Sequence, residues 1–251
     1  MDDYLRTFST ALNTEPTSKI HRTQVPEAPR SYQELDHHQF GEQFRQAAQK
    51  EYHEIWGKGC FAKTTHTAET ADAEVLPLMW VFTYKFDEDG YLYRFKARLV
   101  VRGDLQQPYG DTYAATLAAR TFRALVAIAN QFGLELLQYD VPNAFLNATL
   151  NRKLYAETPD GFKKDGELLQ VLRALYGLKE SPLLWYKDLR ETLQSLGLTS
   201  IPGFPCVYVN NWLIMFVYVD DIVMAFHPSN QHLHRSFEKK LDKHYNLKCL
   251  S

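Results

Sequence analysis

Two adjacent carboxylates, Asp220 and Asp221, lie between two apolar runs of the sequence. The runs, residues 212–217 and 222–226, are typical of β-strands buried on at least one face, so the pair is predicted at the turn of a hairpin. Unpaired negative charges there would repel each other and lose hydration, at a cost on the order of several kcal/mol. A divalent cation would remove this cost, but aspartate is also common in tight turns. The pair alone therefore fits either a metal site or a turn.

A third carboxylate, Asp140, ends the apolar segment 134–140, and Pro142 then turns the chain away. An aspartate at the tip of a buried strand is a frequent position for catalytic groups in sheet proteins. A simple turn residue at the end of a strand is also common. Asp140 is therefore a candidate catalytic group whose partners the local sequence does not name.

A basic stripe is predicted on a second hairpin. Residues 79–86 and 91–101 have the composition of strands, and residues 87–90 form an acidic turn that ends in glycine. Because side chains alternate along a strand, Arg94, Lys96 and Arg98 share one face. Three cations in a row favour an anionic partner such as a triphosphate, and a solvated surface is the alternative. The net charge of −2 adds no overall signature of nucleic-acid binding.

The remaining pattern alternates between short strands and amphipathic helices that would hold these groups. Residues 1–30 read as an extended or disordered lead-in, and residues 61–75 read as a loop. Ser31 and Glu34 resemble a capping box before a helix that ends at Gly57. Further helices are predicted at 121–132, 182–196 and from about 227 to 245, and strands at 154–157, 168–172 and 206–209.

Several classes of protein are disfavoured by composition. No apolar run approaches the roughly 20 residues that span a bilayer, and the first residues lack the pattern of a signal peptide. Cys60, Cys206 and Cys249 lie far apart without CxxC spacing, which indicates a reducing compartment and buried or incidental thiols. His232 and His234 are expected at the surface.

Four motifs, in this order, carry a specific resemblance. They are Lys96-Ala-Arg-Leu-Val100, residues 138–147 (QYDVPNAFLN), residues 175–186 (LYGLKESPLLWY) and Tyr218-Val-Asp-Asp221. Together they closely resemble the reverse transcriptase of copia-type long-terminal-repeat retrotransposons, over roughly residues 31–250. The lead-in resembles the variable segment between integrase and polymerase in the Pol polyprotein.

The resemblance implies an α+β fold, that of a right-hand polymerase with fingers and palm. The palm would be an antiparallel sheet backed by helices, and the fingers would carry a separate hairpin. The implied boundaries are about 76–132 and 150–180 for the fingers, and about 133–149 and 181–250 for the palm.

The resemblance also implies RNA-directed DNA synthesis with two metal ions. Asp140, Asp220 and Asp221 would be the catalytic metal ligands, and the main-chain carbonyl of Val141 would add another. Mg2+ suits such oxygen ligands, and Mn2+ is an alternative. Two cations held about 4 Å apart can activate the primer 3′-hydroxyl and stabilise the departing pyrophosphate.

Nucleotide-binding residues follow from the same resemblance. Lys96 and Arg98 would bind the incoming triphosphate, with Lys85 as a weaker candidate on the partner strand. Phe145 would lie beneath the sugar and exclude a 2′-hydroxyl, although an ordinary core phenylalanine is the alternative. Gly177 and Lys179 belong to a loop expected near template and nucleotide. Trp185 and Tyr186 are expected to be packing residues.

The sequence departs from the family pattern at several positions. Leu183 and Glu180 stand where arginine and glutamine are usual, and Glu180 is expected to place a negative charge near the template phosphates. The segment 113–120 lacks the usual Ser-Pro-Val-like core. The chain stops at residue 251, where the family continues into the primer grip, a thumb and ribonuclease H. We therefore expect a domain truncated before these parts.

Three functional interpretations follow. The first is an RNA-directed DNA polymerase domain. The second is a truncated, catalytically silent remnant with at most weak nucleic-acid binding. The third, an RNA-directed RNA polymerase, is disfavoured by Phe145 and by the Tyr-Val-Asp-Asp form of the acidic motif. The implied partners are an RNA or DNA template with primer, deoxynucleoside triphosphates, and the integrase and ribonuclease H parts of Pol, with no membrane. An intracellular location is expected, in a cytoplasmic particle or the nucleus.

Overall fold

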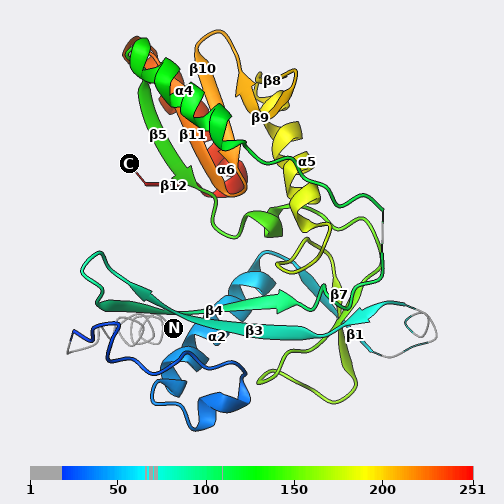
Figure 1. The fold of residues 1–251 in the computed structure, drawn as a ribbon. Coiled ribbons are helices and arrows are strands. Elements are labelled where there is room, and N and C mark those ends of the chain that lie inside the picture. Colours follow the sequence, from blue (N-terminus) through cyan, green and yellow to red (C-terminus); the bar gives the residue numbers. More distant parts are fainter. Residues whose placement is uncertain (1–18, 66, 68–69, 71–72, 109, 251) are drawn as a thin grey trace, which may run out of the picture.

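The computed structural model describes residues 19–250 except 66, 68–69, 71–72 and 109. Two lobes are joined by extended connections (Figure 1). The helical elements are η1 (Gln33–Asp36), α2 (Gly41–Gly57), α4 (Ala119–Gln131), η2 (Ala144–Asn147), α5 (Ser181–Ser195), η3 (Pro228–Asn230) and α6 (Gln231–Tyr245). The strands are β1 (Phe61–Thr65), β2 (Val75–Leu76), β3 (Leu78–Phe86), β4 (Leu92–Val101), β5 (Glu135–Asp140), β6 (Tyr155–Glu157), β7 (Glu167–Val171), β8 (Thr199–Ile201), β9 (Phe204–Val209), β10 (Leu213–Tyr218), β11 (Asp221–Phe226) and β12 (Lys248–Cys249).

The upper lobe in Figure 1 is built on an antiparallel sheet with the strand order β12-β5-β11-β10-β9-β8. The central hairpin joins β10 to β11, and Tyr218 pairs with Asp221 beside its turn. Strand β5 then pairs with β11, which sets Asp140 directly opposite Asp221. Both strands therefore carry a carboxylate to the same end of the sheet.

Helices cover both faces of this sheet, because successive residues of its central strands β10 and β11 are apolar and point to opposite faces. Helices α5 and α6 pack on the face formed by residues such as Tyr139, Met215 and Ile222. Helix α4 lies over the opposite face, where the ring of Phe122 contacts that of Phe216 with centroids 5.8 Å apart. The α+β class and the antiparallel sheet backed by helices are confirmed.

The lower lobe holds the long β3–β4 hairpin, which forms a two-stranded sheet of its own, and a four-stranded sheet with the order β1-β7-β6-β2 (Figure 1). Helix α2 packs on the hairpin, where the Phe44 ring lies 5.3 Å from that of Phe82 and 5.2 Å from that of Phe95. The separate hairpin expected from the sequence is confirmed. The division into fingers and palm stays a prediction.

Most of the predicted elements are confirmed, and some local expectations were wrong. The interval 61–75 contains strands β1 and β2, because Phe61–Thr65 finds its partner β7 more than a hundred residues away. Ser31 accepts a hydrogen bond from the Glu34 amide ahead of the short η1 turn, and does not cap α2. His234 is buried, since its ring stacks on Phe226 at 4.4 Å.

The lead-in is described from residue 19 onwards. Its described part runs beside the β3–β4 hairpin, where the Leu92 amide donates to the Ile20 carbonyl and the Arg22 amide donates to the Gly90 carbonyl. The expectation for residues 1–18 lies outside the described residues. Among the described residues, we find no helix with the length and apolar character needed to cross a membrane.

Candidate active site

The acidic turn is held by contacts from two directions. Val219 adopts a left-handed conformation with φ 58°, which lets the turn close between β10 and β11. The Trp185 indole on α5 donates to the Val219 carbonyl at 2.7 Å. The Val141 amide, just after β5, donates to the Asp220 carbonyl at 2.9 Å. The turn and the end of β5 are therefore fixed to each other through the backbone.

Asp140 interacts electrostatically with both members of the acidic pair. Burial raises the pKa of Asp140, and the negative charges of Asp220 and Asp221 raise it further, while Lys248 and Lys96 act in the opposite sense. The tertiary structure thus brings Asp140 together with a pair of carboxylates that lies eighty residues further along the sequence. Their mutual repulsion makes a cation favourable at this place.

Lys248 is a neighbour of Asp140 that sequence reasoning missed. It lies on β12, whose pairing with β5 sets Lys248 opposite Asp140. No local pattern marks a lysine near the end of the chain as part of the site. Only the pairing of β12 with the edge of the sheet reveals it.

The carboxylates suit a hard divalent cation by their chemistry, but their side chains do not converge on one point. Among the described residues, no group of three His, Cys, Asp or Glu side chains is arranged to hold a metal ion. Asp221 instead accepts a hydrogen bond from Gln138 Nε2 at 3.1 Å. This hydrogen bond engages only Oδ1 of Asp221.

The cationic face predicted on the second hairpin is present on β4. In the strand register Lys85 pairs with Arg94, so it extends the same face. Burial lowers the pKa of Lys96, and the neighbouring cations Arg98 and Lys85 lower it further. Since Lys96 also acts on the pKa of Asp140, the cationic hairpin and the carboxylates are close enough to interact.

An aromatic pair connects the hairpin to the segment after Asp140. Phe145, on the short η2 turn, lies against Tyr176 with ring centroids 4.9 Å apart. The Arg98 guanidinium lies over the same Tyr176 ring, 4.1 Å from its centroid. Tyr176 was not singled out in the sequence, although it belongs to the third motif, because nothing local shows what its ring contacts.

The loop with Gly177 and Lys179 is bound tightly to the end of β4. The Val101 amide donates to the Tyr176 carbonyl at 2.8 Å. Gly177 has φ 94°, and a Cβ there would collide with the Val101 carbonyl oxygen, so glycine is required. Lys179 Nζ donates to the Gln106 carbonyl at 2.8 Å. This contact gives Lys179 a structural partner in the loop after β4.

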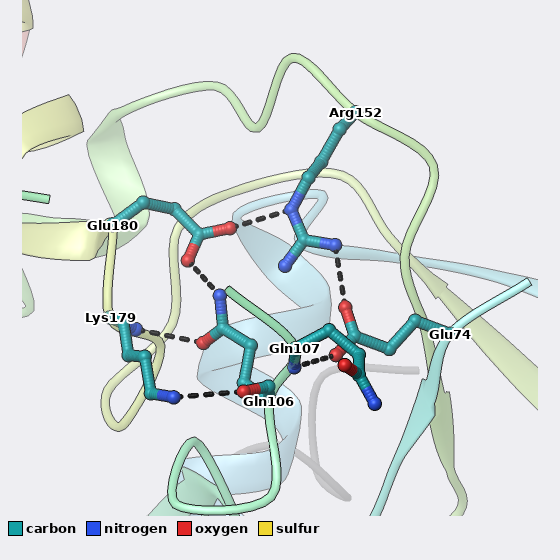
Figure 2. A network of polar contacts seen from close by, with 6 residues as sticks. All are labelled: Glu74, Gln106, Gln107, Arg152, Lys179 and Glu180. Atoms are coloured by element: carbon teal, nitrogen blue, oxygen red, sulfur yellow. Dashed lines mark hydrogen bonds and ion pairs between the residues drawn. The ribbon is translucent and has the colours of Figure 1, made fainter. Parts of the chain in front are cut away.

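The expectation that Glu180 presents its charge to template phosphates was wrong. Its side chain is 6% exposed and accepts a hydrogen bond from Arg152 Nε at 2.7 Å. The amide of Gln106 also donates to Glu180, and Arg152 reaches Glu74 at 2.9 Å (Figure 2). Glu180 is therefore an internal, neutralised anion that ties four chain segments together. The sequence could not show this because Arg152 lies 28 residues upstream in an unpatterned stretch.

A groove of about 780 Å³ opens beside the carboxylates, between α4 and the sheet. Apolar side chains such as Phe122 and Val223 form most of its wall, and Gln138 and Asp221 lie along it. The acidic end of the sheet is thus accessible to a large ligand.

These features define an α+β chain that presents carboxylates at the end of an antiparallel sheet, opposite a cationic hairpin. The family model described as "Reverse transcriptase (RNA-dependent DNA polymerase)" matches residues 65–251. The chain belongs to this family, and the resemblance seen in its motifs is confirmed.

Curated relatives are much longer than this chain. The Pol polyprotein from transposon TNT 1-94 of Nicotiana tabacum is 30% identical over 233 residues, covering 88% of this chain and 17% of the relative. The Pol polyprotein from transposon RE2 of Arabidopsis thaliana is 35% identical over 156 residues, covering 58% and 11%. The Ty1-DR4 Gag-Pol polyprotein of Saccharomyces cerevisiae is 28% identical over 212 residues, covering 80% and 13%. The chain thus spans less than a fifth of each.

Among solved structures, the foamy viral protease-reverse transcriptase in complex with double-stranded DNA aligns with a TM-score of 0.43 and 15% identity. The alignment covers 93% of this chain and 33% of the viral chain.

Proposed function

We propose that this chain is the RNA-directed DNA polymerase domain of a copia-type retrotransposon, and that it adds deoxyribonucleotides to a primer 3′-hydroxyl by two-metal-ion catalysis. The proposal rests above all on Asp140, which lies opposite Asp221 across two paired strands and within electrostatic range of Lys96. Carboxylates facing a cationic strand suit a reaction that needs both metal ions and a bound triphosphate.

Asp140, Asp220, Asp221 and the carbonyl of Val141 would hold Mg2+, with Mn2+ as a substitute. The bound cations would lower the pKa of the attacking hydroxyl and neutralise charge on the leaving pyrophosphate. Their donor chemistry fits, since these are the oxygen ligands that Mg2+ prefers. Burial and, after it, repulsion from Asp220 and Asp221 raise the pKa of Asp140, and this supports a cation site because a positive charge would stabilise the partly buried carboxylate and relieve the repulsion.

The cationic hairpin would bind the triphosphate. Arg98 offers a planar fork of donors that matches phosphate oxygens, and its position over the Tyr176 ring restricts its motion. Lys96 is half-buried among other cations, and both effects lower its pKa by disfavouring its charged form. A bound anion would stabilise that charged form. Lys85 would contribute at longer range from the partner strand.

Phe145 would select deoxyribonucleotides. Its ring is half-buried and packed on Tyr176, so it has little freedom to move away from a sugar placed above it. A 2′-hydroxyl on that sugar would then meet the ring. Gly177 and Lys179 would act mainly by holding the Tyr176 loop against β4.

The template and primer, RNA or DNA, would approach through the groove beside Asp221. Other parts of a Pol polyprotein, including integrase and ribonuclease H, would be physical partners, as the relatives are Pol polyproteins. The chain would act inside the cell, in a cytoplasmic particle or the nucleus. The pairing of Glu180 with Arg152 removes one argument for a silent remnant, because this charge does not face a template.

Primer extension on poly(rA)·oligo(dT) with Mg2+ or Mn2+ tests the proposal. The wild-type chain should extend the primer, and Asp220→Asn should abolish extension while melting as a folded protein. Extension that survives Asp220→Asn, or a folded wild-type chain that makes no product at high concentration with either metal, would overturn the proposal.

A further inference from the structure

The turn that carries Phe145 is held from behind by two cations. Lys58 Nζ donates to the Pro142 carbonyl at 3.4 Å and to Asn147 Oδ1 at 3.2 Å. Arg173 Nη1 donates to the Leu146 carbonyl at 3.4 Å and to the Asn147 carbonyl at 2.9 Å. Both cations therefore bind oxygen atoms of one short segment, residues 142–147, which begins two residues after Asp140.

The two cations come from different parts of the lower lobe. Lys58 follows directly after α2, whereas Arg173 lies three residues before Tyr176. Arg173 forms a β-bridge with Thr149, and the next residue, Ala174, donates its amide to the Ala148 carbonyl at 2.9 Å. The segment that ends in Tyr176 thus makes two kinds of contact with the Phe145 turn. The Tyr176 ring packs on the Phe145 ring, and Arg173 and Ala174 bind the backbone of the turn.

Placing the cations of Lys58 and Arg173 near each other costs electrostatic free energy, unless both bind oxygen atoms of the turn. Burial lowers the pKa of Lys58, and the positive charge of Arg173 also lowers it, while Cys60 and Glu54 act in the opposite sense. The carbonyl oxygens at the end of the η2 turn offset this repulsion, because they lack partners within the turn and accept well from cations. The cations and the turn therefore stabilise each other.

Apart from the two cations, the turn packs on α5 and Asn143 Nδ2 donates to Glu54 Oε2 at 3.4 Å, and its backbone hydrogen bonds are local. The Leu146 amide donates to the Asn143 carbonyl and the Ala148 amide to the Phe145 carbonyl, both at 3.0 Å. Asn143 adopts a left-handed conformation with φ 56°, which needs support from its surroundings. A turn with so few hydrogen bonds of its own depends on external contacts to keep one position.

We propose that Lys58 and Arg173 are positioning residues that fix the Phe145 ring, and through it the discrimination between deoxyribose and ribose. The effect on sugar discrimination rests on the proposed function of Phe145. The binding of the turn by the two cations does not.

Hydrogen exchange on the intact 251-residue chain tests the positioning itself. In Lys58→Met and Arg173→Met, peptides that contain the Leu146 and Ala148 amides should exchange about tenfold faster or more, with little change in β10 and β11. Lys50→Met removes an exposed cation from α2, the helix that precedes Lys58, as a matched control, and Arg173→Lys should keep most of the protection. Unchanged exchange in both methionine variants would overturn the proposal.

Primer extension tests the consequence. The ratio of ribonucleotide to deoxyribonucleotide kcat/KM should rise about fivefold or more in both methionine variants and stay near wild type in Lys50→Met and Arg173→Lys. A general loss of stability would lower both rates together and leave the ratio unchanged. Faster exchange with an unchanged ratio in an active enzyme would overturn the link to discrimination. If the wild type makes no product, the proposed function fails, and exchange alone decides whether the cations position the turn.

Discussion

The buried ion-pair network around Arg152 gives the sharpest prediction about stability. Arg152 and Glu180 have side chains that are 8% and 6% exposed, and Glu74 is 17% exposed. Arg152→Met leaves both carboxylates without their cation while roughly preserving the volume of the aliphatic stem. Glu74 can gain some hydration, whereas Glu180 cannot.

Removing one partner of a buried ion pair costs about 3–5 kcal/mol. For a domain of this size each kcal/mol lowers Tm by about 2–4 °C, so Arg152→Met should lower Tm by roughly 6–20 °C. Glu180→Gln should cost less, about 1–2 kcal/mol, because its amide oxygen still accepts from Arg152 and Arg152 keeps Glu74. The remaining cost arises because the new amide nitrogen in that variant would face the side-chain amide nitrogen of Gln106, and both groups are donors.

Thermal and urea unfolding of a double-mutant cycle measure these effects. The cycle comprises Arg152→Met, Glu180→Met and the double variant, which should be more stable than the sum of these two single changes predicts, by about 1–3 kcal/mol, because neither member of the Arg152–Glu180 pair is then buried without the other. Arg102→Met is the matched control, because Arg102 pairs with Asp104 in an ion pair whose side chains are 42% and 59% exposed. Its Tm should stay close to wild type.

Two results would refute this reasoning. The first is a loss below about 1 kcal/mol for Arg152→Met, which would mean that the network is hydrated in solution. The second is strict additivity in the cycle, which would mean that Arg152 and Glu180 act independently.

Three other perturbations test the site and its surroundings. The raised folded pKa of Asp140 contributes stability that is complete below about pH 4 and is lost as the pH rises through that pKa. Because Asp220→Asn removes a negative charge that repels Asp140, it should raise Tm near pH 7 without Mg2+ and reduce the gain in Tm on adding Mg2+. Equal gains in Tm for wild type and variant would count against a metal site. Phe145→Ala should admit ribonucleotides more readily in primer extension, and unchanged sugar selectivity would exclude its role as a gate. Burial lowers the pKa of His234 from 6.5, so the stability that this shift contributes is complete above pH 6.5 and is lost as the pH falls through the folded pKa. His234→Phe should therefore flatten the decline of Tm below about pH 6.5. An unchanged dependence of Tm on pH would contradict this.

The strands and helices that the sequence predicted are those with strong periodicity. The sequence pattern was sufficient to predict the strand in 91–101, where apolar residues alternate, and the strands on either side of the acidic pair, which are apolar runs. Each of these strands must bury one or both of its faces. Strand β1 was missed because the four residues after Phe61 are small or polar and depend on pairing with β7. The intrinsic β-propensity of such segments is weak, and pairing with a strand that is distant in sequence decides their conformation.

Motif order alone was enough to identify the family and to nominate Asp140, Asp220, Asp221 and Phe145, because chemistry restricts residue types at fixed positions along the chain. Contacts between distant segments added Tyr176, Lys248 and the two cations behind the Phe145 turn, and they changed Glu180 from a charge facing the template to half of a buried pair. A side chain's type and spacing are local properties. Its burial and its partner depend on which segments the fold brings together, and for a charged residue these two quantities set the sign of its effect.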